Sequence, residues 1–260
     1  MTKSAFIQAL HSNSISEMQA IPKSDLHSHA GRGGSKAYIE RWANTKIAPP
    51  ARPFASLNEM NEWLNDNIKC HCPPGLEGYL LRIEAAFDQA AADNVQVLAL
   101  SYSKDEVAAL GGMESFIRQM DYMRQKFAPN TDFYPDLTLG YTKDELQVLD
   151  EIFSYKWFNA IDIVNYSNTY SIKELKSLCR KAKDNGMVLK AHLGEFGGPD
   201  ELMRYAEELE LDEIQHGVAA ARSPQIMRWL AKHEIKLNVC PTSNIMLGVC
   251  DSYATHSIRI

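Results

Sequence analysis

The sequence predicts an α/β protein of the (β/α)8 TIM-barrel type, because short apolar runs of strand length alternate with segments of helical period. The 260 residues, with 45% hydrophobic content, are enough for one such barrel. The run at residues 95–102 is almost continuously apolar, as expected of a parallel strand buried on both faces. We count seven β/α units, and therefore predict one domain over residues 1–260 that lacks the last β/α unit of the barrel.

The strands that we predict are residues 24–30, 95–102, 133–141, 160–166, 187–191, 213–216 and 236–240. The helices between them are predicted at residues 76–94, 105–127, 143–153, 171–185 and 200–209, with a further helix that begins at Ser223-Pro224. Residues 1–20 are interpreted as an N-terminal extension or helix. Residues 32–78 are interpreted as a helical insertion after the first strand, with Ser56 as the N-cap of a helix that runs to Ile68.

Two glycine signals modify this pattern. Gly186 follows the helix at residues 171–185 and is typical of a C-terminal stop. The pair Gly111-Gly112 is a weak point inside the helix predicted at residues 105–127.

The composition excludes several classes of function. The formal net charge is −6 and no cluster of Lys and Arg stands out, so we expect no nucleic-acid partner. No apolar run approaches the roughly 20 residues that cross a bilayer, and the first 20 residues lack the pattern of a signal peptide. We therefore expect a cytoplasmic protein with no membrane partner.

The five cysteines do not form a disulfide pattern, because their number is odd and their spacing irregular. The run Cys70-His71-Cys72 has the form of half a zinc clip, but no second half has matching spacing. It adjoins Pro73-Pro74-Gly75, so a reduced surface loop is the better interpretation.

A histidine pair stands at the end of the first predicted strand, in Asp25-Leu26-His27-Ser28-His29. Side chains alternate along a strand, so His27 and His29 point to the same face and both imidazoles can reach one metal ion. Two neighbouring histidines can also be ordinary polar residues of a loop. Matching groups at the ends of other strands are needed to decide.

Such groups follow the fifth, sixth and seventh predicted strands. They are His192-Leu193-Gly194-Glu195, Gln215-His216-Gly217 and Cys240-Pro241-Thr242-Ser243-Asn244. The carboxyl ends of the strands are where a TIM barrel keeps its active site. Ser243 is no nucleophile by its surroundings, and we interpret Ser243 and Asn244 as loop-capping groups.

Taken together and in this order, these motifs resemble those of the adenosine/adenine deaminase family, within the metal-dependent amidohydrolase superfamily. The resemblance extends to Gln215-His216-Gly217-Val218 and to Thr255-His256-Ser257-Ile258-Arg259, which is similar to a His-Pro-Ile segment of the family. It spans nearly the whole chain.

The resemblance implies a set of roles. His27, His29 and His192 are the expected ligands of one Zn²⁺ ion, with Fe²⁺ or Mn²⁺ as alternatives, and three neutral imidazoles leave a coordination position for water. Glu195 is expected to donate a proton to the ring nitrogen of the substrate, and His216 to orient the attacking oxygen. The expected activity is hydrolytic deamination of an amino-purine or related aminated heterocycle, with release of ammonia.

The sequence departs from the family in three places. It ends at Ile260, before the eighth strand and the Asp-Asp pair that supplies a further ligand in the family, so we expect a fragment of a longer chain or else a truncated relative. After the first strand it has Gly31-Arg32, and Arg32 is either a contact for an anionic substrate group or a solvated loop charge. After the fourth strand, Asn165-Tyr166-Ser167 replaces a glycine-containing turn.

Arg32, Asn165 and Gly194 are the predicted substrate-binding residues. The expected partner is a small-molecule substrate, and a homo-oligomer is compatible with the sequence. Two other functions remain open: an amidohydrolase that cleaves an amide, ester or lactone, and a non-catalytic relative that only binds metal.

Overall fold

The computed structural model describes residues 3–32, 34–165 and 169–259, and the chain divides into two compact units. Unit 1 comprises Met1–Ala48, Asp66–Tyr102 and Val107–Tyr134. Unit 2 comprises Pro49–Asn65, Ser103–Glu106 and Pro135–Ile260. Each unit is described by itself.

The strands are β1 (Lys23–His29), β2 (Val95–Ser103), β3 (Asp132–Leu139), β4 (Ala160–Ile163), β5 (Val188–Leu193), β6 (Glu213–His216) and β7 (Lys236–Asn238). The α-helices are α1 (Lys3–Ser12), α2 (Ile15–Ala20), α3 (Lys36–Ala43), α4 (Leu57–Asn67), α5 (Gly75–Ala92), α6 (Lys104–Ala109), α7 (Met113–Phe127), α8 (Glu145–Ser154), α10 (Ile172–Asp184), α11 (Pro199–Glu208), α12 (Pro224–Lys232) and α13 (Pro241–Met246). Short 3-10 helices are η1 (Lys69–His71), η2 (Val218–Arg222) and η3 (Ser257–Arg259). The strand order follows the chain from β1 to β7, and helices separate successive strands, which confirms the predicted TIM-type α/β class.

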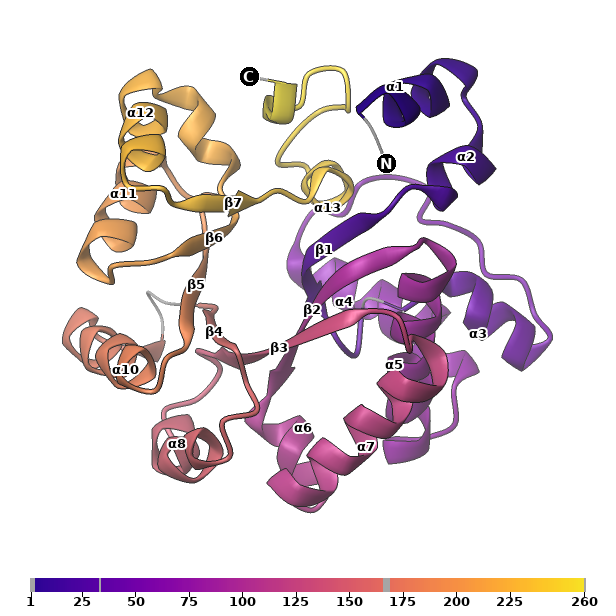
Figure 1. Cartoon of the computed structure of the whole chain (residues 1–260), viewed down its shortest axis with the longest axis horizontal. Helices are drawn as coiled ribbons and strands as arrows, with labels where there is room; N and C mark the ends of the chain where they lie inside the picture. Colours follow the sequence, from indigo (N-terminus) through magenta and orange to yellow (C-terminus); the bar gives the residue numbers. More distant parts are fainter. Residues whose placement is uncertain (1–2, 33, 166–168, 260) are drawn as a thin grey trace. The chain divides into compact units, whose positions relative to one another are not determined.

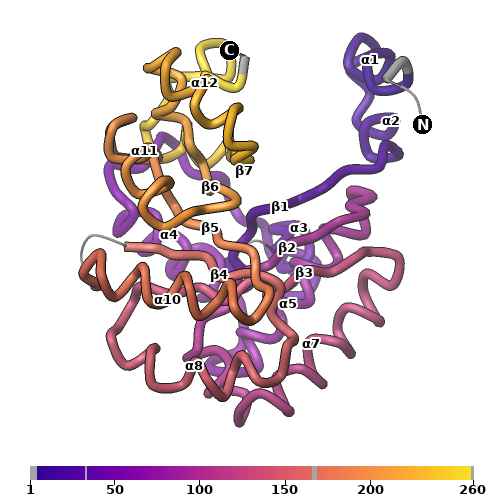
Figure 2. Tube along the Cα trace, turned by 60° about the vertical axis from the view of Figure 1, so that its left-hand side comes forward, coloured from indigo at the N-terminus to yellow at the C-terminus, as the bar shows by residue number. Residues whose placement is uncertain are grey.

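Unit 1, which includes β1, β2 and the start of β3, is organised around an aromatic core between its strands and its helices. β1 pairs in parallel with β2, and α5 packs against α3 and α7. The rings of Tyr102 and Phe116 meet edge to face with centroids 5.1 Å apart, and Phe87 meets Phe133 in the same way at 5.3 Å. Figure 2 shows α1 and α2 leading into β1.

The helix predicted over residues 105–127 is in fact two helices, α6 and α7. Gly111 and Gly112 separate them with φ angles of +84° and +98°, in the region that favours glycine. The predicted weak point is therefore a complete break.

Unit 2 contains the parallel strands β4 to β7, which pair with one another in chain order. α10 and α11 pack against β5, and α11 also contacts α12 (Figure 1). Ser171 and Glu174 form a capping box at the start of α10, because each side chain accepts a hydrogen bond from the other residue's backbone N–H. Gly186 follows α10 with φ +76°, as a C-terminal stop requires.

The insertion predicted at residues 32–78 divides between the units. It begins with α3, which Ser35 caps, and includes α4, which Ser56 caps by accepting from the Glu59 N–H. Residues 49–65 belong to unit 2, where the Phe54 N–H donates to the Met246 carbonyl at 2.6 Å. That the chain forms one domain stays a prediction.

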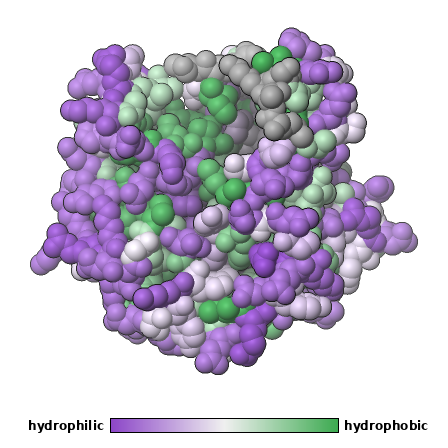
Figure 3. Space-filling model, viewed as in Figure 1, coloured by the Kyte–Doolittle hydropathy of each residue, from purple (hydrophilic) through white to green (hydrophobic). Residues whose placement is uncertain are grey.

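Polar side chains cover most of the face shown in Figure 3, and hydrophobic residues gather between them in smaller groups. In the part of the chain that the structure describes, no helix has both the length and the apolar character needed to cross a membrane.

Candidate active site

The histidine pair of unit 1 lies at the end of β1, as predicted. The inward face of β1 carries Asp25, His27 and His29, which are half-buried, whereas Leu26 is 36% exposed. The rings of His27 and His29 meet edge to face, with centroids 5.2 Å apart, although the register with β2 shifts between Asp25 and Ser28. The prediction that both imidazoles lie on one face of the strand is confirmed.

The histidine of unit 2, His192, is held by a buried carboxylate. Asp162 of β4 lies opposite Lys190 of β5 in register, and His192 is on the same face of β5 two residues later. The His192 Nδ1 lies 3.1 Å from Asp162 Oδ1, and Asp162 is fully buried. Nδ1–H donates to the carboxylate in this arrangement, so Nε2 carries the lone pair that a metal ligand needs.

Charge at His192 follows from the same contacts. Burial alone lowers the pKa of His192, but the facing Asp162 carboxylate, with a smaller contribution from Glu195, outweighs burial and raises it. The two carboxylates thus favour positive charge at this position.

Glu195 reaches the site because the chain turns sharply at Gly194. Gly194 has φ +67°, and a Cβ there would lie 2.5 Å from Leu202 Cδ1 and 3.1 Å from Ala219 Cβ. After this turn, Glu195 Oε1 lies 3.6 Å from His216 Nδ1, which is too long for a hydrogen bond. Burial raises the pKa of Glu195, and the nearby His192 only partly opposes this. Glu195 also lines an open cavity of about 520 Å³.

His216 ends β6 in a strained backbone conformation. Its φ is +67°, followed by Gly217 at +66°, and a non-glycine residue adopts this region only where its surroundings enforce it. The side chain is buried, with its ring centroid 5.4 Å from that of His192, and its Nδ1 lies 3.1 Å from Asn244 Nδ2. Unit 2 thus brings His192, Glu195 and His216 together.

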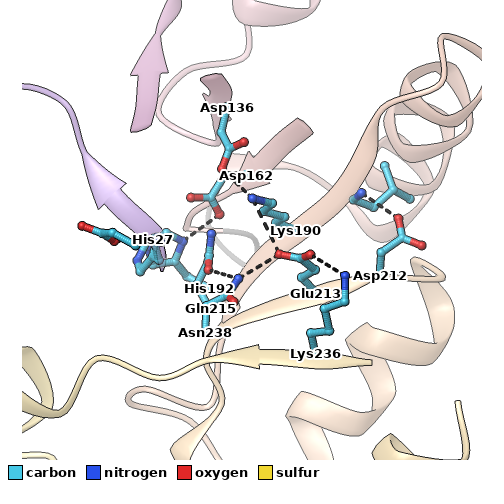
Figure 4. Close-up of polar contacts among 12 residues, drawn as sticks. His27, Asp136, Asp162, Lys190, His192, Asp212, Glu213, Gln215, Lys236 and Asn238 are labelled. Carbon is cyan, nitrogen blue, oxygen red and sulfur yellow. Dashed lines mark hydrogen bonds and ion pairs between the residues drawn. The ribbon is translucent and has the colours of Figure 1, made fainter. Parts of the chain in front are cut away.

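A buried polar network extends along the same strands (Figure 4). The Lys190 Nζ lies 2.9 Å from Asp136 Oδ2 and 3.6 Å from Glu213 Oε2. The Asn238 amide donates to Glu213 Oε2 at 2.9 Å and to Gln215 Oε1 at 3.0 Å. Burial alone lowers the pKa of Lys190, but the carboxylates around it, Asp136 foremost, raise it above its usual range. Lys190 is thus a buried cation held by carboxylates.

The predicted substrate contacts are placed less distinctively. Arg32 is exposed, and its backbone N–H donates to the His29 carbonyl. Asn165 is exposed with φ +46°, a conformation that asparagine tolerates well, while Tyr166 and Ser167 lie outside the described residues. Gly194 is buried in the turn that positions Glu195. Their binding of substrate stays a prediction.

Sequence reasoning gave no role in this site to Asp162, to Asn244 or to His256, whose Nε2 lies 3.2 Å from Asn244 Oδ1. An aspartate inside the apolar run Ala160–Ile163 was a signal for Asp162, because a buried carboxylate needs a partner. The interpretation of Asn244 as a loop-capping group is wrong, since Asn244 is fully buried in α13 and contacts His216. α13 itself begins directly after residue 240, where a strand end was predicted.

Comparisons with known proteins agree with these motifs. Residues 145–260 match the adenosine deaminase family model. A candidate adenosine/adenine deaminase from Treponema pallidum is 24% identical over 256 residues, which is 95% of this chain and 83% of that protein. Two Shewanella adenosine deaminases, from S. denitrificans and S. loihica, are 35% and 36% identical over 80 residues, and this chain covers 24% of each.

Solved structures share the fold over most of the chain. An adenine deaminase from Arthrobacter aurescens matches with a TM-score of 0.71 and 18% identity, covering 92% of this chain and 78% of that one. The Arabidopsis N6-mAMP deaminase gives 0.69 and 17%, covering 94% and 79%. A Burkholderia amidohydrolase with bound Zn gives 0.64 and 20%, covering 93% and 72%.

The resemblance that the sequence motifs predicted is therefore confirmed. The chain is similar to adenosine/adenine deaminases: the adenosine deaminase family model matches residues 145–260, and the Treponema pallidum relative is similar over 95% of the chain.

Proposed function

We propose that the chain is a zinc-dependent hydrolytic deaminase of an amino-purine or related aminated heterocycle. The observation that carries the proposal is the pairing of a half-buried carboxyl group, Glu195, whose pKa is raised by burial, with a histidine, His192, whose Nδ1 contacts Asp162. A proton donor and a metal-ligating imidazole side by side are what hydrolysis of an aromatic C–N bond requires.

The donor set proposed for the metal is His27, His29 and His192. The chemistry of these residues fits a divalent ion, because His192 presents Nε2 with its tautomer fixed by Asp162 and three imidazoles suit zinc. When bound, such an ion supplies hydroxide near neutral pH by lowering the pKa of water. The bound Zn of the Burkholderia amidohydrolase supports zinc, with iron or manganese as the alternatives.

The protein's own residues perform the proton steps. Partial burial raises the pKa of Glu195 and so favours its protonated form, and in the proposed reaction Glu195 delivers a proton to the ring nitrogen of the substrate. Protonation of this nitrogen makes the adjacent ring carbon more electrophilic. His216, 3.6 Å from Glu195, is placed to orient the incoming oxygen, after which the amino group leaves as ammonia.

Ammonia release from a panel of substrates tests the proposal. The panel holds adenine, adenosine, AMP and N6-methyl-AMP, since the fold is shared with an adenine deaminase and an N6-mAMP deaminase. Zinc-loaded protein should deaminate at least one compound. Absence of ammonia from every one of them, with hydrolysis of amide or lactone substrates instead, would replace deamination by the broader amidohydrolase activity.

Single variants separate metal binding from proton transfer. Glu195→Gln should keep bound metal, measured by elemental analysis. Its turnover rate should fall by about 10²–10⁴-fold, because an amide cannot donate the proton. His192→Ala should lose both metal and turnover. Glu208→Gln, in an exposed ion pair with Lys176, is the matched control and should change neither. A near-normal rate in Glu195→Gln would remove Glu195 from the mechanism.

A further inference from the structure

A chain of hydrogen bonds connects His256, Asn244 and His216, and the donor in each bond follows from the first bond of the chain. It begins at His256, which is buried at 2% exposure and follows α13 along the chain. The backbone N–H of Ile258 donates to His256 Nδ1 at 3.0 Å. A backbone N–H can only donate, so His256 Nδ1 carries a lone pair and the ring proton of this neutral imidazole is on Nε2.

The direction passes next to Asn244. His256 Nε2 lies 3.2 Å from Asn244 Oδ1, and with its proton on Nε2 the imidazole donates to the amide oxygen. This contact fixes which end of the amide is oxygen. The Asn244 NH₂ group then faces His216, where Nδ2 donates to Nδ1 at 3.1 Å.

The last link determines the state of His216. An Nδ1 atom that accepts a hydrogen bond has no proton, so the proton of the neutral His216 ring is on Nε2. Glu195 Oε1 lies 3.6 Å from the same Nδ1, which is beyond hydrogen-bond distance.

Asn244 is rigid enough to impose this choice. The Asn244 residue is fully buried. Its backbone N–H donates to the Cys240 carbonyl at 2.9 Å, and its backbone carbonyl accepts from the backbone N–H groups of Val249 and Cys250 at 2.8 and 3.1 Å. A buried amide with both ends bonded cannot rotate without losing hydrogen bonds, at a cost of about 1–3 kcal/mol per unsatisfied group.

We propose that Asn244 and His256 are positioning residues that hold His216 as a neutral imidazole with its proton on Nε2. His216 then acts toward the attacking oxygen as a hydrogen-bond donor and not as a base. The inference rests on the proposed function only for this last role, because the tautomer itself is a property of unit 2 without substrate.

Asn244→Asp provides the sharpest test. The carboxylate has nearly the shape of the amide but can only accept, so it should draw the His216 proton to Nδ1 and leave a lone pair on Nε2. NMR of protein labelled with ¹⁵N in the imidazole rings reports which nitrogen carries the proton. The His216 signals are identified by their loss in His216→Gln.

We expect the Nε2–H tautomer for His216 in the native protein and the Nδ1–H tautomer in Asn244→Asp. Asn185→Asp is the matched control, because the Asn185 amide donates to the Lys181 carbonyl at an exposed position, and it should leave His216 unchanged. A native Nδ1–H tautomer, or an unchanged tautomer in Asn244→Asp, would overturn the inference.

His256 variants keep the test available if Asn244→Asp does not fold. His256→Leu removes the donor that orients the amide, so His216 should show both tautomers. His256→Gln keeps an N–H at a similar reach and should restore the Nε2–H form. A single Nε2–H tautomer in His256→Leu would show that His256 has no positioning role.

Activity separates this inference from the proposed function. Ammonia release by the native protein decides whether the chain is a deaminase, and the NMR result decides the tautomer. If both hold, Asn244→Asp should lower kcat by about 10²–10³, the effect of removing one donor to a developing charge, with KM nearly unchanged. A rise in KM with an unchanged kcat would contradict the role given to the Nε2 proton.

Discussion

Replacing Lys190 by Met should destabilise unit 2 strongly, because it removes the cation that neutralises a group of buried carboxylates. The Lys190 side chain is 7% exposed, and its ammonium group lies 2.9 Å from Asp136 and 3.6 Å from Glu213. Methionine matches the length of the lysine stem, so the packing of the stem is largely kept and the charge is the main loss.

The magnitude follows from these distances. At an effective dielectric constant of about 20, the two attractions amount to about 6 and about 5 kcal/mol. The cost of removing the charges from water offsets much of this gain, and loss of one partner of a buried ion pair costs about 3–5 kcal/mol. We expect Lys190→Met to lower the free energy of unfolding by this amount at pH 8.

Urea denaturation followed by circular dichroism measures the loss. The cost should be smaller at pH 5 than at pH 8, because the Asp136 carboxyl, whose pKa is raised to about 7, is protonated at pH 5 and then leaves less charge uncompensated. Lys181→Met, which removes a surface ion pair with Asp150, is the control and should have little effect. A cost below about 1 kcal/mol at pH 8, or one that does not change with pH, would refute the reasoning.

Two further predictions concern single positions in unit 2. Burial raises the pKa of Asp136 from its ordinary value of 3.8 to about 7, so the folded protein holds a proton that the unfolded chain releases. This carboxyl should therefore make the free energy of unfolding fall as the pH rises from about 4 to about 7, by up to about 1.4 kcal/mol per pH unit. In urea titrations at several pH values, Asp136→Asn should remove that slope. Equal slopes in the native protein and the variant would contradict the prediction. Gly217→Ala should lower the free energy of unfolding by about 1–2 kcal/mol because of the residue's φ of +66°. A second loss should come from the new Cβ, which would lie 2.7 Å from Leu237 Cδ2. Leu237→Ala should recover the second part in a double-mutant cycle, and purely additive costs would argue against that clash.

The fold and half of the candidate site could be predicted from the sequence, because they depend on local rules. Strand alternation alone placed His27 and His29 on one face of β1, and helix-capping residues located the ends of α4 and α10 within a residue or two. The run His192-Leu193-Gly194-Glu195, which begins in β5, grouped these two residues through its resemblance to a deaminase motif and not through a local rule.

The remainder depended on contacts between distant residues, which no local pattern encodes. Asn244 in a Pro-Thr-Ser-Asn run is typical of a loop cap, and only its burial against His216 and His256 reveals its place in the site. Lysine is usually a surface residue, so the sequence alone does not indicate that Lys190 is buried. Its partner Asp136 lies 54 positions earlier in the chain. Charged residues inside apolar strands are the one signal that indicates such partners.

The hydrogen bond between the Phe54 N–H and the Met246 carbonyl has a consequence for the order in which the protein is assembled. The ribosome completes residues 49–65 early, but the helix α13 that receives them emerges only after almost all of unit 2. Contacts so far apart along the chain form late, because a large loop must close first. During synthesis, the Phe54–Trp63 segment should therefore stay open to proteases until residue 246 has been made, and pulse proteolysis of stalled chains would reveal that interval.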